Sequence, residues 1–547
     1  MMPRIMIFLL LLLISIWDYS YALDINVIYP KPESRIPSVD STFIFGNTDP
    51  DAVLYINDNI IPVHNGGGFL GYIDVDDGDF IFQIEAIKDG DTASIEIPVK
   101  IGSESSKFLL DSLVINAGSM LPSMDMELPA DETIKIGFNG TTNCMAFYSV
   151  DSVKWLPLYE NRAETGNENS VFGDISKGAE SFLSEYIGYC SLGSIADTIA
   201  AKLNYMLISL DGDSLITPAS RSLKKLTPDV RIVEFTGKSE IVRTAHGAGY
   251  QLLYQPPGIR AVYDGYEGEY TRIKLSNSKT GFVPTDSIRT MPEGTPIPSS
   301  RIRFIKIEDR TKETIVKIPL AFKLPYRIEQ ELNPPRLILY IFGGIGDTDW
   351  IKNIPHGGAV RIAHWSQPED NVYKLTMELT AGTHWGYYAG YDKNIFALHI
   401  KKGPKSRGIK NGSLNGLRIV LDPGHCSDLG AVGPTGLTEK EVNLWIAHKV
   451  RKLLESKGAE VIQTRYGYEP VGIYERPEIA NNFKADILIS IHNNALPDGT
   501  NPFLNNGTST YYYHPQSKLL ADKIQTRLTE KTGLPDFGVY YGNLALT

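Results

Sequence analysis

Three residues in the last quarter of the chain have side chains that bind transition metals. His425 and His492 each follow a short apolar run, in LDPGHCSDLG and ILISIHNNA, and Glu439 lies between them in TGLTEKEVNL. Two imidazoles and one carboxylate form a ligand set typical of catalytic zinc, which keeps one coordination position open for water. Singly, each has an ordinary structural use, as a hydrogen-bonded histidine or a glutamate near a helix N-terminus. The sequence therefore predicts a zinc site only if the three side chains meet.

The elements around these residues must bring them together. Short apolar runs typical of strands alternate with helical periodicity, in the chain order 417–422, 439–457 (helix), 459–465, 472–484 (helix), 485–495, 507–514 and 516–532 (helix). This alternation indicates an α/β domain with a mostly parallel sheet. Active-site groups of such sheets gather at the carboxyl ends of the strands. We therefore expect the two histidines and Glu439, which opens the first helix, at one edge.

The first helix has clear end signals. Thr438 followed by Glu441 fits a capping box, and Gly458 fits a helix stop. Its apolar residues predict one buried face, made of Val442, Ile446, Val450 and Leu453/Leu454.

The strings around the candidate ligands resemble the zinc-dependent N-acetylmuramoyl-L-alanine amidases of the third, LytC-like family, over residues 417–547. The matching segments are Asp422-Pro-Gly-His425, Gly430–Leu444, Arg476 with Ile479-Ala480-Asn481, and Ser490-Ile-His492-Asn-Asn494-Ala495. The resemblance implies that His425, Glu439 and His492 bind one Zn²⁺. It also implies hydrolysis of the amide between the muramoyl lactyl group and the L-alanine of peptidoglycan stem peptides.

Residues next to the predicted ligands have further expected roles. Asn494 and Arg476 are expected to bind substrate, with an orienting or capping role for Asn494 left open. Cys426 stands where the family usually has glycine. We expect a bystander thiol that sensitises the site to oxidation, because adjacent residues rarely both reach one metal.

The resemblance places the family's general-base glutamate in a strand beyond Thr547. Within the chain, Glu475 and Glu478 are the nearest alternatives, and a surface ion pair is their expected use. Glu441 is two residues from Glu439 and points about 200° away around the helix. No catalytic base is therefore assigned within the chain. The domain at 417–547 is expected to be incomplete, and the 547-residue chain to bind zinc but turn over poorly.

Two other functions remain open from the sequence. One is a non-catalytic peptidoglycan-binding protein with an inactive amidase-like domain, which the missing base favours. The other is a different zinc peptidase class, suggested by the H-x-x-D spacing of His425 and Asp428. That class leaves the G-L-x-E-K-x-V-N-L string unexplained, and the full zinc ligand set favours the amidase.

The preceding three quarters of the chain predict all-β modules that would serve either an enzyme or a wall-binding protein. In order, these are an Ig-like β-sandwich at 23–104 with strands at 41–48, 52–58 and 80–87, SH3-like modules at 105–300, clearest at 249–288 with an earlier copy around 150–210, an AMIN-like β-sandwich at 301–402, and a linker at 403–416. The AMIN-like module contains Trp350, Trp365 and Trp385. Exposed tryptophans would stack on sugar rings, whereas buried ones would belong to the core.

The N-terminus has the layout of a secretory signal peptide, residues 1–22. Met1–Arg4 carries a positive charge, Ile5–Trp17 is uncharged and apolar, and small residues precede a cleavage site after Ala22. The run is short for a membrane span, and an uncleaved anchor is the alternative. We therefore expect export to the periplasm or the extracellular space, without stable membrane insertion after cleavage.

Composition excludes some partners. The net charge is −11 and no Lys/Arg-rich run occurs, so we expect no nucleic-acid partner. The three cysteines are too few for a disulfide framework. Cys144 and Cys190 either pair with each other or remain buried thiols.

Overall fold

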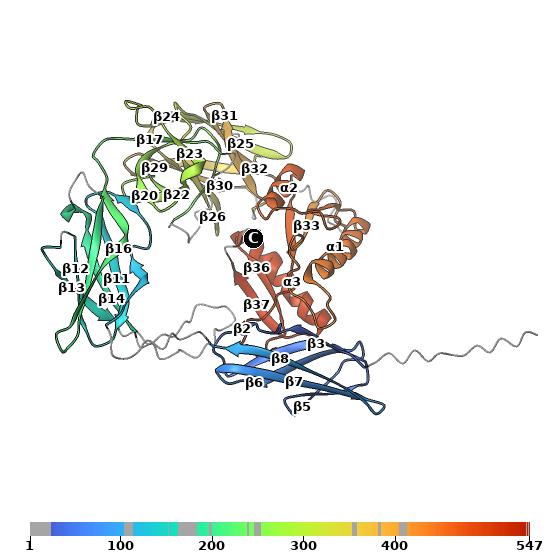
Figure 1. The fold of residues 1–547 in the computed structure, drawn as a ribbon. Helices are drawn as coiled ribbons and strands as arrows, with labels where there is room; N and C mark the ends of the chain where they lie inside the picture. Colours follow the sequence, from blue (N-terminus) through green and yellow to red (C-terminus); the bar gives the residue numbers. More distant parts are fainter. Residues whose placement is uncertain are drawn as a thin grey trace, which may run out of the picture.

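The computed structural model describes residues 23–102, 113–150, 152–161, 183–195, 200–237, 240–244, 253–352, 358–380, 384–403, 413–542, 544 and 546. The predicted signal peptide and most of the predicted linker lie outside these residues. The described chain is mostly β, and its α-helices lie in the C-terminal region. Figure 1 shows the first module, in blue, against the last, in red, although they stand at opposite ends of the chain.

The first module consists of two sheets that face each other across one core. One sheet has the order β1 (Ile25–Tyr29), β3 (Ser41–Thr48), β6 (Gly68–Asp74), and the other β2 (Arg35–Ile36), β8 (Asp91–Ile101), β7 (Gly78–Lys88), β4 (Val53–Ile56), β5 (Asn59–Ile61). Ile44, Leu54 and Phe82 lie in the core without measurable exposure. The three strands predicted at 41–48, 52–58 and 80–87 are confirmed as β3, β4 and β7. We call this module the N-terminal sandwich.

The next region forms a sheet of thirteen strands. They are β9 (Ile115–Leu121), β10 (Met126–Leu128), β11 (Thr133–Thr141), β12 (Met145–Ser149), β13 (Leu156–Asn161), β14 (Leu183–Ser191), β15 (Ala201–Ile208), β16 (Ser214–Lys225), β17 (Ile232–Phe235), β20 (Arg260–Glu267), β21 (Tyr270–Lys274), β22 (Thr280–Pro284) and β23 (Ile288–Thr290). A separate pair joins β18 (Glu240–Val242) to β19 (Leu253–Gln255). The sheet serves two hydrophobic cores. One spans Ile115–Leu223, and the other runs from Val233 into the following module as far as Ile400.

The third module contains two sheets on that shared core. Their orders are β28 (Gly344–Lys352), β24 (Ser300–Asp309), β25 (Glu313–Pro319), β32 (Ile395–Lys401), β31 (Tyr387–Asp392), and β26 (Tyr326–Leu332), β27 (Pro335–Phe342), β30 (Val372–Leu379), β29 (Val360–Glu369). Its tryptophans differ in environment. Trp350 is 77% exposed, Trp365 stacks on Tyr373, and Trp385 packs against the core of the C-terminal region. Of these three described tryptophans, Trp350 is the most exposed.

The C-terminal region has the strand–helix alternation expected from the sequence. Its elements are β33 (Arg418–Pro423), α1 (Glu439–Ser456), β34 (Glu460–Gln463), α2 (Glu475–Phe483), β35 (Ile487–Ile491), β36 (Thr508–Tyr512), α3 (Lys518–Thr532) and β37 (Asp536–Tyr541). Strand β33 pairs in parallel with both β34 and β35, and β36 pairs in parallel with β37. The core between β33 and α1 includes Ile419, Leu421 and Ala447.

Two further observations concern the chain as a whole. Among the described residues, no helix combines the length and the apolar character needed to cross a membrane. Cys144, Cys190 and Cys426 are all free thiols, so the pairing alternative for Cys144 and Cys190 is not adopted.

Candidate metal centre

Two neighbouring parallel strands deliver the two histidines to one edge of the sheet. Strand β33 pairs with β35 so that Asp422 lies beside Ser490 and Pro423 beside Ile491. His425 and His492 follow these positions, and the Gly424 amide donates to the Ile491 carbonyl oxygen at 2.9 Å. The predicted meeting of the strand ends is therefore present.

The three predicted ligands lie together. Ligand atoms of His425, Glu439 and His492 are all within 4.8 Å of one another. The Glu439 carboxylate lies between the rings, with Oε2 3.1 Å from Nε2 of His425 and Oε1 3.1 Å from Nδ1 of His492. Two nitrogens and a carboxylate converging in this way fit a zinc ion with an open position.

Close packing around the rings requires glycine at two positions. A Cβ on Gly424 would lie 2.3 Å from the His492 ring, and one on Gly430 would lie 2.6 Å from Glu439 Oε2. His425 itself has φ 61°, in the left-handed region that a residue with a side chain rarely adopts. Such backbone strain is concentrated at functional sites, where the surrounding structure must maintain it.

The buried Glu439 carboxylate is held in its charged form. Burial would raise its pKa, but hydrogen bonds from the Ala431 and Asn493 amides and from Asn443, together with nearby His425, hold the pKa below its usual value. The two amides donate at 2.9 and 2.8 Å to different carboxylate oxygens. A charged carboxylate is the form that binds a metal ion.

Asp428 orients the first histidine. Its carboxylate contacts Nδ1 of His425, which directs Nε2 of that ring towards Glu439. A carboxylate behind a histidine ligand fixes the tautomer and ring orientation. The sequence analysis noted Asp428 only as part of an H-x-x-D spacing and did not predict this role.

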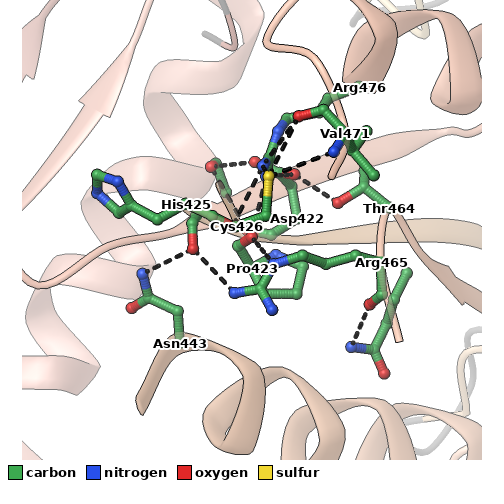
Figure 2. A network of polar contacts seen from close by, with 12 residues as sticks. Asp422, Pro423, His425, Cys426, Asn443, Thr464, Arg465, Val471 and Arg476 are labelled. Carbon is green, nitrogen blue, oxygen red and sulfur yellow. Dashed lines mark hydrogen bonds and ion pairs between the residues drawn. The ribbon is translucent and has the colours of Figure 1, made fainter. Parts of the chain in front are cut away.

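A buried polar network holds the chain immediately before His425, as Figure 2 shows. Asp422 and Arg465 are completely buried and Arg476 is 4% exposed. Arg476 donates to Asp422 at 2.7 Å, and both arginines donate to the Pro423 carbonyl oxygen at 2.9 Å. Arg465 also donates to the Gly424 carbonyl oxygen at 3.0 Å. The Pro423–Gly424 backbone is thus fixed by two guanidinium groups.

This network corrects the expectation for Arg476. Its guanidinium is buried and occupied by Asp422 and by backbone carbonyl groups, so it supports the turn before His425 and does not offer a surface for substrate. Arg465 was missed by the sequence analysis. Its position at the end of the strand predicted at 459–465 was the available signal, but a strand-end arginine is usually exposed.

Cys426 and Asn494 flank the histidines differently. The Cys426 sulfur is buried, accepts from the Val471 amide at 3.3 Å, and in Figure 2 points towards Val471 and Arg476 while the His425 ring points away. Burial would raise the pKa of this thiol, but hydrogen bonds from the backbone and nearby Arg476 lower it. Asn494 is exposed just beyond His492.

The buried face of α1 differs from the predicted one. Ile446 is 37% and Leu453 67% exposed, whereas Asn443 and Ala447 are buried. Two polar residues determine this face. Glu439 faces the histidines, and Asn443, one turn later, donates to the Gly424 carbonyl oxygen at 3.3 Å. Val450 and Leu454 pack against the core as predicted.

Glu441, Glu475 and Glu478, the other acidic residues considered in the sequence analysis, do not belong to the three-residue cluster. The capping box at Thr438 and Glu441 is confirmed, with Thr438 Oγ1 donating to Glu441 at 2.6 Å. Glu475 and Glu478 are exposed on α2, and Glu475 accepts from the Gly472 amide at 3.3 Å.

The C-terminal region is similar in sequence to known proteins. Residues 419–547 match the model of the N-acetylmuramoyl-L-alanine amidase family. A probable cell wall amidase LytH of Staphylococcus epidermidis is 36% identical over 167 residues, which are 30% of this chain and 52% of that protein. The N-acetylmuramoyl-L-alanine amidase LytC of Bacillus subtilis is 41% identical over 129 residues, 23% of this chain and 25% of that protein. The chain thus spans about half the length of the first of these relatives. The similarity to N-acetylmuramoyl-L-alanine amidases is thus located in residues 419–547.

A solved structure is also similar. It is the catalytic domain of CwlV, an N-acetylmuramoyl-L-alanine amidase from Bacillus (Paenibacillus) polymyxa var. colistinus, with 36% identity over 24% of this chain and 72% of that chain and a TM-score of 0.22.

Proposed function

We propose that this protein binds one Zn²⁺ through His425, Glu439 and His492. We also propose that it hydrolyses the amide between the muramoyl lactyl group and L-alanine in peptidoglycan. The observation that carries the proposal is the convergence of these three side chains within 4.8 Å in a domain that matches the amidase family. The position of two ligands on adjacent strand ends and one on a helix start also supports it, because a solely wall-binding protein has no need of this ligand set.

The chain's own residues have distinct parts in this proposal. Zinc, when bound, supplies a Lewis acid suited to polarising an amide carbonyl group. Glu439 contributes the negative charge, Asp428 holds the His425 tautomer, and Arg465 and Arg476 hold the strained turn before His425. Exposed Asn494, two residues beyond His492, is the residue we assign to substrate.

Metal analysis of the purified full chain tests the zinc site. We expect about one zinc per chain, lost in His425→Ala and His492→Ala and weakened by orders of magnitude in Glu439→Ala. His448→Ala is the matched control, since His448 lies on α1 but bonds to Gln463 outside the cluster, at 2.8 Å. Undiminished zinc in the His492 variant would overturn the ligand assignment.

Product analysis tests the reaction. Digestion of purified peptidoglycan by the zinc-loaded full chain should release stem peptides with a free N-terminal L-alanine, detected by mass spectrometry. Release of disaccharides or of fragments cut within the peptide would assign a different bond. No release by a chain that holds zinc would favour the alternative of a binding protein with an inactive amidase-like domain.

We further propose that the β modules, interpreted as Ig-like, SH3-like and AMIN-like, hold the protein on the wall. Trp350 supports this proposal, since it is 77% exposed on the edge strand β28 and lies beside Phe304, which is 46% exposed. Trp350→Ala should reduce co-sedimentation with isolated sacculi, whereas Trp365→Phe should not. Equal sedimentation of the Trp350 variant and the unaltered chain would exclude Trp350 as a wall contact.

The proposed location is outside the cytoplasmic membrane, in the periplasm or beyond. It rests on the signal-peptide layout of residues 1–22 and on the cell wall amidases among the relatives. Mass spectrometry of the exported protein should give a mature start at Leu23. A retained Met1 in the membrane fraction would indicate an anchor.

A further inference from the structure

Residues at the far end of the chain from the metal centre contact the loops that surround it. In Figure 1 the N-terminal sandwich lies directly against the C-terminal region. Two loops of that region reach it: the Glu439 loop, residues 430–438, which leads into α1, and the His492 loop, residues 492–500, which follows β35.

Asp498, in the His492 loop, is the centre of the contact. The Tyr29 hydroxyl donates to its two carboxylate oxygens at 2.7 and 2.8 Å, and Thr42 Oγ1 donates at 2.9 Å. Tyr72 donates to the Gly499 carbonyl oxygen at 2.8 Å. Thr42 has no measurable exposure, and burial and the Asp498 carboxylate raise the pKa of Tyr29. Hydrogen bonds to a charged acceptor are stronger than those between neutral groups. The bonds to Asp498 therefore hold the His492 loop strongly against the N-terminal sandwich.

The Glu439 loop is held by the same sheet. Asn47 Nδ2 donates to the Pro434 carbonyl oxygen at 2.9 Å. A Cβ placed on Gly68 would lie 3.2 Å from the Pro434 ring. The Gly68 backbone therefore packs closely against that ring. All the donors come from β1, β3 and β6, the three strands of one sheet.

Both loops are also attached to one group, the Glu439 carboxylate. Its Oε2 accepts from the Ala431 amide of the Glu439 loop, and its Oε1 from the Asn493 amide of the His492 loop. Each loop is therefore held near its start by a candidate zinc ligand. The N-terminal sandwich holds the Glu439 loop at its middle, at Pro434, and the His492 loop near its end, at Asp498.

We propose that the N-terminal sandwich is a positioning part of the metal centre, and that Tyr29, Thr42 and Asn47 are positioning residues that hold the Glu439 and His492 loops through Asp498 and Pro434. The proposal rests on the proposed function only in treating the cluster as a zinc site. The module is then required for the ligand geometry in addition to any contact it makes with the wall.

Hydrogen exchange of the full chain, with and without zinc, tests this directly. In Tyr29→Phe and Asp498→Asn, amides in peptides covering 430–438 and 492–500 should exchange about tenfold faster, as expected for losing a hydrogen bond to a charged group. Amides of β33 and α1 should keep their protection, which shows that the domain remains folded. The double variant should exchange less than the two single effects combined would give, because both changes weaken the same contact between Tyr29 and residue 498.

Ser41, the residue before Thr42, offers a matched control. Ser41→Ala removes a hydrogen bond to Asp74 within the N-terminal sandwich and leaves the contacts to Asp498 in place. It should leave loop exchange unchanged, whereas Thr42→Val should raise it. Transfer of zinc to a chelator should be several-fold faster in Tyr29→Phe and Asp498→Asn than in Ser41→Ala.

The outcomes separate the two proposals. If Tyr29→Phe and Asp498→Asn exchange like the unaltered chain in both loops, the positioning role is overturned, whatever the activity. If the loops respond but the unaltered chain neither holds zinc nor cleaves peptidoglycan, the positioning contact stands and the proposed function falls.

Discussion

The two histidines reach the metal centre from segments that are stabilised in different ways. The turn before His425 is held within its own domain by Asp422, Arg465 and Arg476, all almost completely buried. The His492 loop contains exposed residues next to the histidine and is attached at its far end to Tyr29, 469 residues earlier in the chain. The first attachment is local and internal, and the second depends on a separate module.

This difference shows which parts of the centre the family match describes. Asp422, Arg465 and Arg476 lie within the matched residues 419–547, so their network belongs to the domain itself. Tyr29 and Thr42 lie far outside that range. The contacts that Tyr29 and Thr42 make with the His492 loop are therefore not described by the family match.

The largest effect is expected from breaking the internal network. Arg476→Met would leave the Asp422 carboxylate buried without its ion-pair partner, and removing one partner of a buried pair costs about 3–5 kcal/mol. Unfolding by denaturant, followed by circular dichroism, measures the loss. Arg527→Met, at an exposed pair on α3, should cost less than about 1 kcal/mol. If the two variants lose similarly small amounts of unfolding free energy, the buried network does not stabilise the turn before His425 as proposed.

A smaller effect is expected at Asp428. Asp428→Ala removes the carboxylate behind His425, and loss of such a partner weakens metal binding about 10- to 100-fold. Competition with a chelator of known affinity gives the change. Asp522→Ala, which affects only the exposed Lys518 pair, should leave zinc affinity unaltered. An unchanged affinity in Asp428→Ala would show that the buried network alone orients His425.

A change at Thr438 tests helix α1, whose first residue, Glu439, accepts hydrogen bonds from both loops. Thr438→Ala removes the cap of α1, which presents Glu439, and should reduce stability by about 1 kcal/mol. Thr438→Ser keeps the hydroxyl group and should lose only a fraction of this. Thermal unfolding of the two variants side by side decides, and equal losses would assign the effect to the methyl group.

The smallest effect is expected on the outer face of α1. Leu453→Ser changes a side chain that is 67% exposed and should alter stability by less than about 0.5 kcal/mol. Leu454→Ser, one residue later, removes packing against the core and should cost clearly more. Denaturant titrations that rank the two in the opposite order would contradict the packing of Leu454 against the core.

The sequence was sufficient to place the three candidate ligands at one edge of the sheet, because their positions depend on local patterns. A strand that ends at Pro423, another that ends at Ile491, and a capped helix that begins at Glu439 define one sheet edge without knowledge of long-range contacts. The same reasoning placed only part of the inner face of α1, since Val450 and Leu454 pack against the core whereas Ile446 is 37% exposed. It counted apolar residues, whereas the site requires two polar ones, Glu439 and Asn443, on the inner face.

Contacts between polar side chains distant in sequence could not be predicted. Nothing in the pattern around Tyr29 indicates a hydrogen bond to a residue 469 positions later. Arg465 and Arg476 carry no apolar or periodic signal that distinguishes them from surface arginines. Such pairings are determined by the folded arrangement of whole modules.

The separation between Tyr29 and Asp498 also has a consequence for biosynthesis. At a synthesis rate of about 5–20 residues per second, Asp498 follows Tyr29 by roughly 20–90 s, ample time for a small domain to fold. In synthesis, and in export from the N-terminus, Tyr29 and Thr42 therefore precede their acceptor. Because the N-terminal sandwich has a core of its own, its sheet can form before the His492 loop arrives.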